Sequence, residues 1–201
     1  EEAEDEELLS PFAIEEEEPD VATVASAETR RTLALRKGKR LYREACATCH
    51  GAAGVSVNPE WPNLAGQHEL YLRDQIAAFR DGVRENPLMW PFVKDLKDSD
   101  IAELATYYAA QSRAIAANGD SSLVAQGETL SAYCKACHGM WGVPAANEWP
   151  ILAGQHATYL AAQLGKYKSG ERVNSHMQAA IARLGEPEFA ALAAYYSQLK
   201  P

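Results

Sequence analysis

Long apolar runs are missing from this chain, and their absence limits what it can be. No stretch reaches the roughly 18 apolar residues that a membrane-spanning helix needs. Nothing alternates convincingly between apolar and polar residues, so no strand is predicted. No signal peptide is visible at the N-terminus, and we expect the sequence to be that of a mature, processed protein. Its 201 residues suit one or two all-helical domains without a spanning segment.

Sulfur-containing residues are also few: the sequence holds four cysteines and three methionines. All the cysteines fall in two pentapeptides, CATCH at 46–50 and CKACH at 134–138. C-x-x-C-H is the attachment signature of c-type haem, in which the cysteines form thioethers and the histidine binds the iron. The sequence therefore predicts two covalently bound haem c groups. Their expected attachment and proximal-ligand residues are Cys46, Cys49, His50, Cys134, Cys137 and His138.

Other uses of a C-x-x-C pair fit less well. A zinc ribbon keeps its two pairs about 15–20 residues apart, far closer than here. A thioredoxin-like redox pair needs a surrounding βαβ pattern, and none is present. Two structural disulfides would not need a histidine after each pair.

The charge of the chain is unevenly distributed. The formal net charge is −9, but residues 1–20 hold eleven acidic side chains and no basic one. From residue 21 onward, 17 acidic residues face 19 basic ones. We expect residues 1–28 to form an acidic extension. Its first 20 residues either stay solvated and disordered or lie against the body or a neighbouring molecule, and as a functional alternative their field steers a basic redox partner. No nucleic-acid partner is expected.

An internal repeat organises the rest of the chain. A shift of 88 positions superposes the second half on the first without a gap, from the first cysteine to the last tyrosine pair. The matched segments include EWP at 60–62 and 148–150, and LAGQH at 64–68 and 152–156. Such self-similarity predicts two copies of one fold. We place the two domains at 29–115 and 116–201.

Apolar periodicity and turn residues predict three helices in each repeat. They span residues 29–49, 69–81 and 100–112, and then 123–137, 157–169 and 187–200, with a linker at 113–122. Asp98 or Ser99 is expected to cap the third helix. Pro87, Met89 and Pro91 are expected to prevent a regular helix before it.

Each iron needs a sixth ligand, and two methionines are placed to supply it. Met89 lies 39 residues after His50, and Met177 lies 39 residues after His138. A thioether suits haem iron and raises its reduction potential. Met140 lies too close to its own histidine to reach the opposite haem face, so we assign it to packing. At the second haem His176, next to Met177, stays open as an alternative ligand.

Two further repeat-matched pairs have open roles. Arg84 and Arg172 either bind haem propionates, because a guanidinium pairs well with a carboxylate, or are solvated surface residues. His68 and His156 cap or pack the second helix of each repeat, or form hydrogen bonds near a propionate or between the domains; we do not expect them to bind iron.

With these motifs, the chain resembles a dihaem class I cytochrome c of the cytochrome c4 family. The resemblance rests on the two C-x-x-C-H motifs, the two P-x-L-A-G-Q-like segments at 62–67 and 150–155, and the two downstream methionines. It covers residue 30 to the end. It implies two domains related by a pseudo-twofold axis, with haems close enough for internal electron transfer. It also implies that Leu64, Leu152, Pro62 and Pro150 belong to the haem sites. The carbonyls of Pro62 and Pro150 are expected to accept a hydrogen bond from the ring N–H of His50 and His138.

Two haems without an open iron position exchange electrons but do not readily bind a substrate. We therefore expect a periplasmic electron-transfer protein rather than an enzyme, shuttling between a donor dehydrogenase or membrane complex and a terminal oxidase or reductase. It would act as a monomer or homodimer. The alternatives are the cytochrome subunit of a flavocytochrome c sulfide dehydrogenase, and a dihaem enzyme such as a thiosulfate dehydrogenase or peroxidase. An enzyme would need an unusual or labile ligand at one iron.

Overall fold

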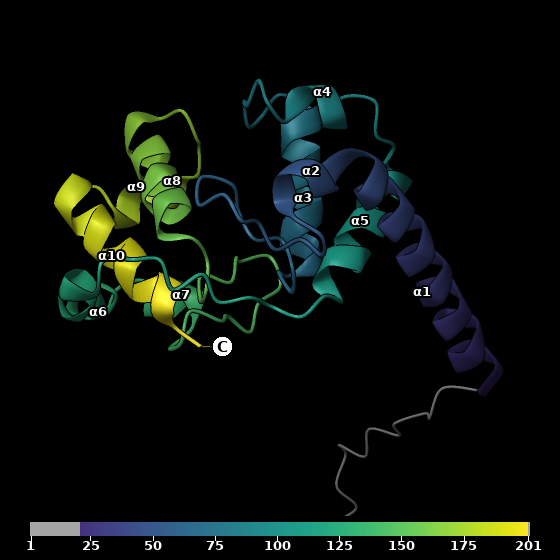
Figure 1. Cartoon of the computed structure of the whole chain (residues 1–201), viewed down its shortest axis with the longest axis horizontal. Coiled ribbons are helices and arrows are strands. Elements are labelled where there is room, and N and C mark those ends of the chain that lie inside the picture. Colours follow the sequence, from purple (N-terminus) through teal and green to yellow (C-terminus); the bar gives the residue numbers. More distant parts are fainter. Residues whose placement is uncertain (1–20, 201) are drawn as a thin grey trace, which may run out of the picture.

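The computed structural model describes residues 21–200, and every regular element in that range is a helix (Figure 1). The first repeat comprises α1 (Val21–Leu41), a π-helical turn (Tyr42–Cys46), α2 (Ala47–His50), α3 (Glu69–Arg80), α4 (Trp90–Val93) and α5 (Asp98–Ala109). The second comprises a 3-10 turn (Ser121–Leu123), α6 (Val124–Leu130), α7 (Lys135–His138), α8 (Ala157–Ser169), α9 (Ser175–Ala180) and α10 (Glu186–Gln198). The predicted all-α fold of two tandem units is confirmed.

The first repeat begins earlier in the sequence than predicted. The first helix begins at Val21 rather than at residue 29, so it extends into the range that we assigned to the acidic extension. Residues 1–20, which hold the acidic run, lie outside the described residues. The domain limits 29–115 and 116–201 stay a prediction.

Between residues 21 and 200 no helix is both long and apolar enough to cross a membrane.

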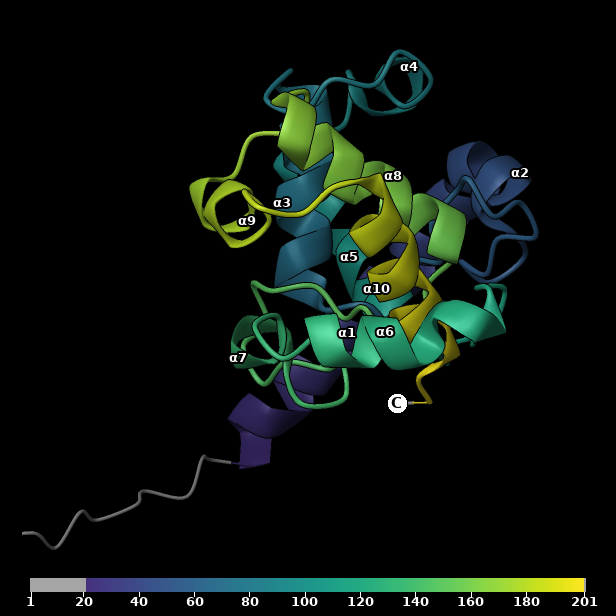
Figure 2. The same cartoon turned by 90° about the vertical axis from the view of Figure 1, so that its left-hand side faces the viewer.

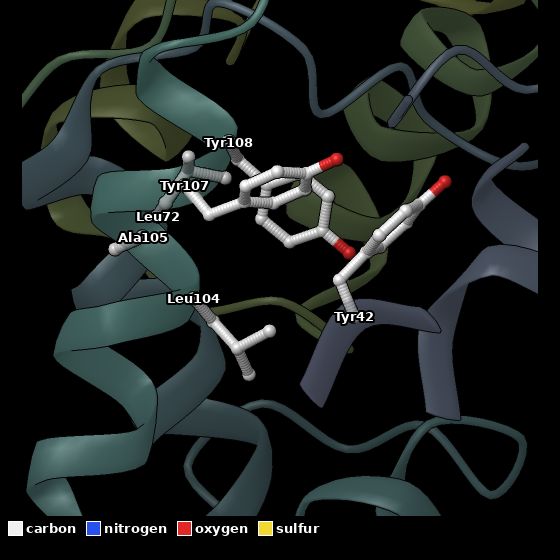
Figure 3. Packing of buried hydrophobic residues seen from close by; sticks show 6 residues of the cluster. All are labelled: Tyr42, Leu72, Leu104, Ala105, Tyr107 and Tyr108. Carbon is white, nitrogen blue, oxygen red and sulfur yellow. The ribbon is translucent and has the colours of Figure 1, made fainter. Parts of the chain in front are cut away.

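Each repeat packs its last helix against the helix that precedes its C-x-x-C-H motif and against the helix that follows it. α5 packs on α1 and α3, and α10 packs on α6 and α8 (Figures 1 and 2). Figure 3 shows the buried cluster of the first repeat, formed by Tyr42, Leu72, Leu104, Ala105, Tyr107 and Tyr108. The matching cluster of the second repeat is Leu160, Leu192, Ala193, Tyr195 and Tyr196. The paired tyrosines thus belong to the two cores.

A glycine lets the two long helices of each repeat approach closely. A Cβ on Gly38 would lie 2.0 Å from the carbonyl oxygen of Glu103, and a Cβ on Gly127 would lie 2.0 Å from that of Ala191. The residues that the glycines contact, Glu103 on α5 and Ala191 on α10, are 88 positions apart in the sequence. The two glycines themselves are 89 positions apart. The first repeat therefore has one extra residue between its glycine and its first cysteine. The π-helical turn absorbs that residue, as π-bulges do.

The helices predicted to carry the haem motifs are interrupted before each motif. The predicted helix 29–49 is interrupted by the π-helical turn, and the predicted helix 123–137 is broken between Leu130 and Lys135. These breaks reorient the chain just before each C-x-x-C-H motif. Apolar periodicity does not reveal them, because the residues on both sides keep a helical pattern.

The segments that carry the matched methionines are more helical than predicted. Pro91 lies in the first turn of the short helix α4, where its missing N–H loses no hydrogen bond. Met177 lies within α9, a short helix outside the three helices predicted for its repeat.

In both last helices the capping side chain is a carboxylate at the third helical residue, so the predicted cap at Asp98 or Ser99 is wrong. The N-cap of α5 is Lys97 rather than Asp98 or Ser99, and the backbone N–H of Lys97 donates to the Asp100 carboxylate (3.0 Å). In the matching position of α10, the N–H of Gly185 donates to Glu188 (2.9 Å).

We predict that Gly127→Ala destabilises the second repeat. The added methyl group would collide with the α10 backbone at Ala191, and overpacking of this kind lowers the free energy of unfolding by about 1–3 kcal/mol. Gly165→Ala, in an open position within α8, is the control and should raise stability by up to about 1 kcal/mol. Denaturant unfolding followed by circular dichroism measures both. Equal stability of the two variants would contradict the close contact.

Candidate functional site

Each histidine of the C-x-x-C-H motifs is held by a proline carbonyl. Nδ1 of His50 lies 3.0 Å from the carbonyl oxygen of Pro62, and Nδ1 of His138 lies 3.1 Å from that of Pro150. Because a carbonyl oxygen only accepts hydrogen bonds, Nδ1 carries the proton and Nε2 keeps its lone pair for a metal. Burial lowers the pKa of both imidazoles and outweighs the opposite effect of the carbonyl. Both rings are therefore poised in the neutral form that binds iron.

The first cysteine of each motif lies beside a buried tyrosine. All four cysteines are unpaired, and burial raises the pKa of the Cys46 and Cys134 thiols. The hydroxyl of Tyr108 lies near Cys46 and that of Tyr196 near Cys134, but neither makes a hydrogen bond of good geometry. An unsatisfied buried hydroxyl costs about 1–3 kcal/mol, which is expected where the interior is completed by a bound group. Both repeats fit a haem in this respect.

Leu64 and Leu152, which are related by the 88-residue shift, occupy matching positions in the two repeats. Leu64 packs against the first core together with Cys46, and Leu152 packs against the second core together with Cys134. The structure therefore brings the predicted leucine and the first cysteine of each motif to the same core.

The two matched methionines occupy equivalent, half-buried positions. Met89 is the N-cap residue of α4, and Met177 lies in the first turn of α9. His176 is exposed beside Met177. Met140 is 63% exposed, so its predicted packing role is wrong.

An asparagine three residues before each matched methionine fixes the local backbone. Oδ1 of Asn86 accepts from the backbone N–H of Leu88 (2.9 Å) and of Met89 (3.3 Å). Oδ1 of Asn174 accepts from the N–H of Met177 (3.0 Å). Our sequence reasoning missed this pair. The available signal was that Asn86 and Asn174 are themselves related by the 88-residue shift.

Arg84 and Arg172 form one cluster between the repeats. Arg84 donates to Gln75 (2.7 Å), Gln163 (2.7 Å) and the Tyr159 hydroxyl (3.1 Å). Arg172 donates to the same two glutamines, at 2.6 Å and 3.0 Å, and to the hydroxyl of Tyr71 at 3.0 Å. Arg172 is only 7% exposed, so the solvated alternative is wrong for it.

The partners of the two arginines are all neutral. Among residues 21–200, neither guanidinium forms an ion pair with a carboxylate. Burial would raise the pKa of Tyr159, but the charges of Arg84 and Arg172 outweigh burial and lower it. Buried positive charge without a counter-charge is unfavourable. The cluster therefore fits the carboxylates of haem propionates, which a guanidinium binds well.

Two glutamine side chains join the repeats reciprocally. The amide of Gln155 accepts from the backbone N–H of Asn63 (2.8 Å) and donates to its carbonyl (2.9 Å). The amide of Gln67 does the same to the N–H (2.8 Å) and carbonyl (2.9 Å) of Ile151. Both glutamines belong to the LAGQH segments, so their repetition was visible in the sequence, but their role was not.

The histidines of the LAGQH segments also bridge the repeats. His68 and His156 are the N-cap residues of α3 and α8, but neither side chain caps its helix. Nδ1 of His68 lies within 3.2 Å of the Ala146 carbonyl, and Nε2 of His156 lies 3.0 Å from the Ser56 carbonyl. Of the predicted roles, contact between the repeats is the one that the structure shows.

Comparison with known proteins points to a single family. Residues 33–107 match the family model of cytochrome c oxidase, cbb3-type, subunit III. Cytochrome c4 of Pseudomonas aeruginosa is 39% identical over 168 residues, which are 77% of this chain and 83% of that protein. The thiosulfate dehydrogenase electron acceptor of Stutzerimonas stutzeri is 36% identical over 185 residues, 81% of this chain and 86% of that protein.

A solved structure agrees with these sequence matches. The crystal structure of reduced recombinant cytochrome c4 from Pseudomonas stutzeri superposes with a TM-score of 0.77 and 30% identity, covering 83% of this chain and 98% of that one. Together with the two C-x-x-C-H motifs, these matches establish a protein with two covalently bound haem c groups. The chain belongs to the cytochrome c4 family of dihaem electron carriers.

Proposed function

We propose that this protein carries electrons in the periplasm between a donor dehydrogenase or membrane complex and a terminal oxidase or reductase. One observation supports it above the others: both repeats present a histidine fixed by a proline carbonyl and a methionine at the same distance along the chain. These four residues would supply two ligands to each of two irons. An iron without a free position exchanges electrons rather than binding a substrate.

In this proposal each residue of the site has a defined role. The thioether bonds are formed by Cys46 and Cys49 in the first repeat and by Cys134 and Cys137 in the second. The irons would be bound by Nε2 of His50 and of His138 and by the sulfur atoms of Met89 and Met177. The bound haem supplies a one-electron couple. The chain orients the imidazoles, holds the methionine segments through Asn86 and Asn174, and keeps water from the site.

The arginine cluster is proposed to bind haem propionates at the contact between the repeats. Arg84 and Arg172 each bind both Gln75 and Gln163, so a carboxylate bound by one arginine is linked to the other through shared glutamines. The two redox sites are then connected by a single polar network. This arrangement favours electron exchange between them within one molecule.

We predict that Met89→His and Met177→His each remove about half of the near-infrared sulfur-to-iron charge-transfer band and lower one reduction potential, because nitrogen replaces the thioether. Met140→His is the control, since Met140 is exposed and should leave band and potentials unchanged. A spectroelectrochemical titration measures both quantities. A full-intensity band in Met177→His would show that Met177 is not a ligand.

We also predict that Arg172→Gln lowers at least one reduction potential by some tens of millivolts. Removing a buried positive charge stabilises the oxidised, more positive iron. Arg183→Gln removes an exposed charge from the same repeat and should have a much smaller effect. Equal shifts in the two variants, measured by redox titration, would argue against the propionate contact.

A second, narrower candidate is acceptance of electrons from a thiosulfate dehydrogenase, which the similarity to the Stutzerimonas stutzeri protein favours. We predict that the purified chain does not oxidise thiosulfate alone but is reduced when thiosulfate and a thiosulfate dehydrogenase are both added. Reduction is followed by the visible absorbance of the haems. Turnover of thiosulfate by the chain alone would instead identify an enzyme.

A further inference from the structure

The helix α1 carries a concentration of positive charge that the second repeat lacks. Residues 30–43 include seven basic side chains and no acidic one: Arg30, Arg31, Arg36, Lys37, Lys39, Arg40 and Arg43. Aligned through the two close-contact glycines, the matching stretch is 119–132. It has no basic residue and two acidic ones, Asp120 and Glu128. Since the same fold forms without these charges, packing does not require them.

Four of these side chains form a continuous basic stripe, which we define as Arg36, Lys39, Arg40 and Arg43. Gly38 and Tyr42 occupy the face of the helix that packs on α5, and both are buried. The stripe residues are all exposed, and their spacing of three or four places them along one side. Figure 1 shows the first part of α1 extending beyond the rest of the molecule, whereas its C-terminal part, which carries the stripe, packs on α5 through the opposite face.

Most of the charge on this segment has no partner within the described part of the chain. Ion pairs are formed only by Lys37 with Glu103 (3.0 Å) and by Arg40 with Glu44 (3.8 Å), and exposed pairs of this kind are weak. The negative end of the helix dipole favours basic residues in the last turn, which accounts for Lys39 and Arg40. It does not account for the others.

The stripe leads directly to the first haem-attachment motif. Arg43 lies within the π-helical turn, three residues before Cys46. A protein that binds the stripe is therefore placed beside the first haem. A lipid surface would satisfy the charge but would not exchange electrons, so the position favours a redox protein.

We propose that the basic stripe of α1 is a docking surface for the acidic face of a redox partner protein, which exchanges electrons with the first haem. This inference rests on the proposed electron-carrier function. The second haem, whose repeat lacks the stripe, then serves a partner of different surface chemistry. Electrostatic docking of this kind raises the association rate and weakens as salt is added.

The test uses the full-length holoprotein and its variant Arg36→Gln/Arg43→Gln, which leaves both ion pairs of α1 intact. The matched control, Arg183→Gln/Lys200→Gln, removes the same charge from exposed positions of the second repeat. Stopped-flow spectroscopy measures haem reduction by an acidic flavodoxin hydroquinone at increasing ionic strength. Hexaammineruthenium(II), a small cation, serves as a second reductant that does not need a basic surface.

We expect flavodoxin to reduce the wild-type protein about tenfold faster than Arg36→Gln/Arg43→Gln at low ionic strength, and the two rates to converge at high salt. The control should stay within about twofold of wild type. Hexaammineruthenium, which the positive stripe repels, should reduce the stripe variant at least as fast as the wild-type protein. Equal flavodoxin rates in the variant and the control would overturn the docking surface.

Two other outcomes separate this inference from the proposed function. If the haems accept no electrons even from hexaammineruthenium, the electron-carrier function fails. If flavodoxin rates are unaffected while the stripe variant loses binding to phosphatidylglycerol vesicles, the stripe is a lipid contact and the protein-docking proposal is wrong.

Discussion

The hydrogen bond from each motif imidazole to a proline carbonyl is the constraint on which the site depends. It fixes the tautomer, so that the second ring nitrogen keeps its lone pair free for a metal. It also ties the loop after each C-x-x-C-H motif to the helix that bears the cysteines. That loop continues into the LAGQH segment, whose glutamine and histidine reach the other repeat. Ligand orientation and assembly of the two halves thus share one stretch of backbone.

The contact between the repeats follows the symmetry of the duplication. Each glutamine amide binds both backbone groups of one residue in the other half, as a neighbouring strand would. Backbone groups buried in this way need partners, and side-chain amides supply a donor and an acceptor together. The arginine cluster adds a second reciprocal set, in which two glutamines serve both guanidinium groups. Because both sets are built from matched residues, duplication of one unit supplied most of the interface.

Local sequence patterns predicted the parts of this structure that depend on neighbouring residues. The helix predicted at 157–169 coincides with α8, and that predicted at 69–81 ends one residue later than α3. The haem motifs could be recognised because covalent attachment requires two cysteines and a histidine at a fixed spacing. The methionine pair could be recognised because it follows the 88-residue repeat. Sequence patterns did not predict the helix breaks before each motif or the roles of Gln67 and Gln155. Those glutamine contacts join residues more than 80 positions apart, and periodicity carries no information about such pairs.

The π-helical turn has a consequence for how the molecule can vary. One added residue in an ordinary helix would rotate everything before it by about 100° and shift it by about 1.5 Å. Gly38 would then leave its contact with α5. By widening over residues 42–46, the helix keeps both its phase against α5 and the position of the cysteines. One residue can therefore be inserted between the close-contact glycine and the first cysteine without loss of the contact between α1 and α5.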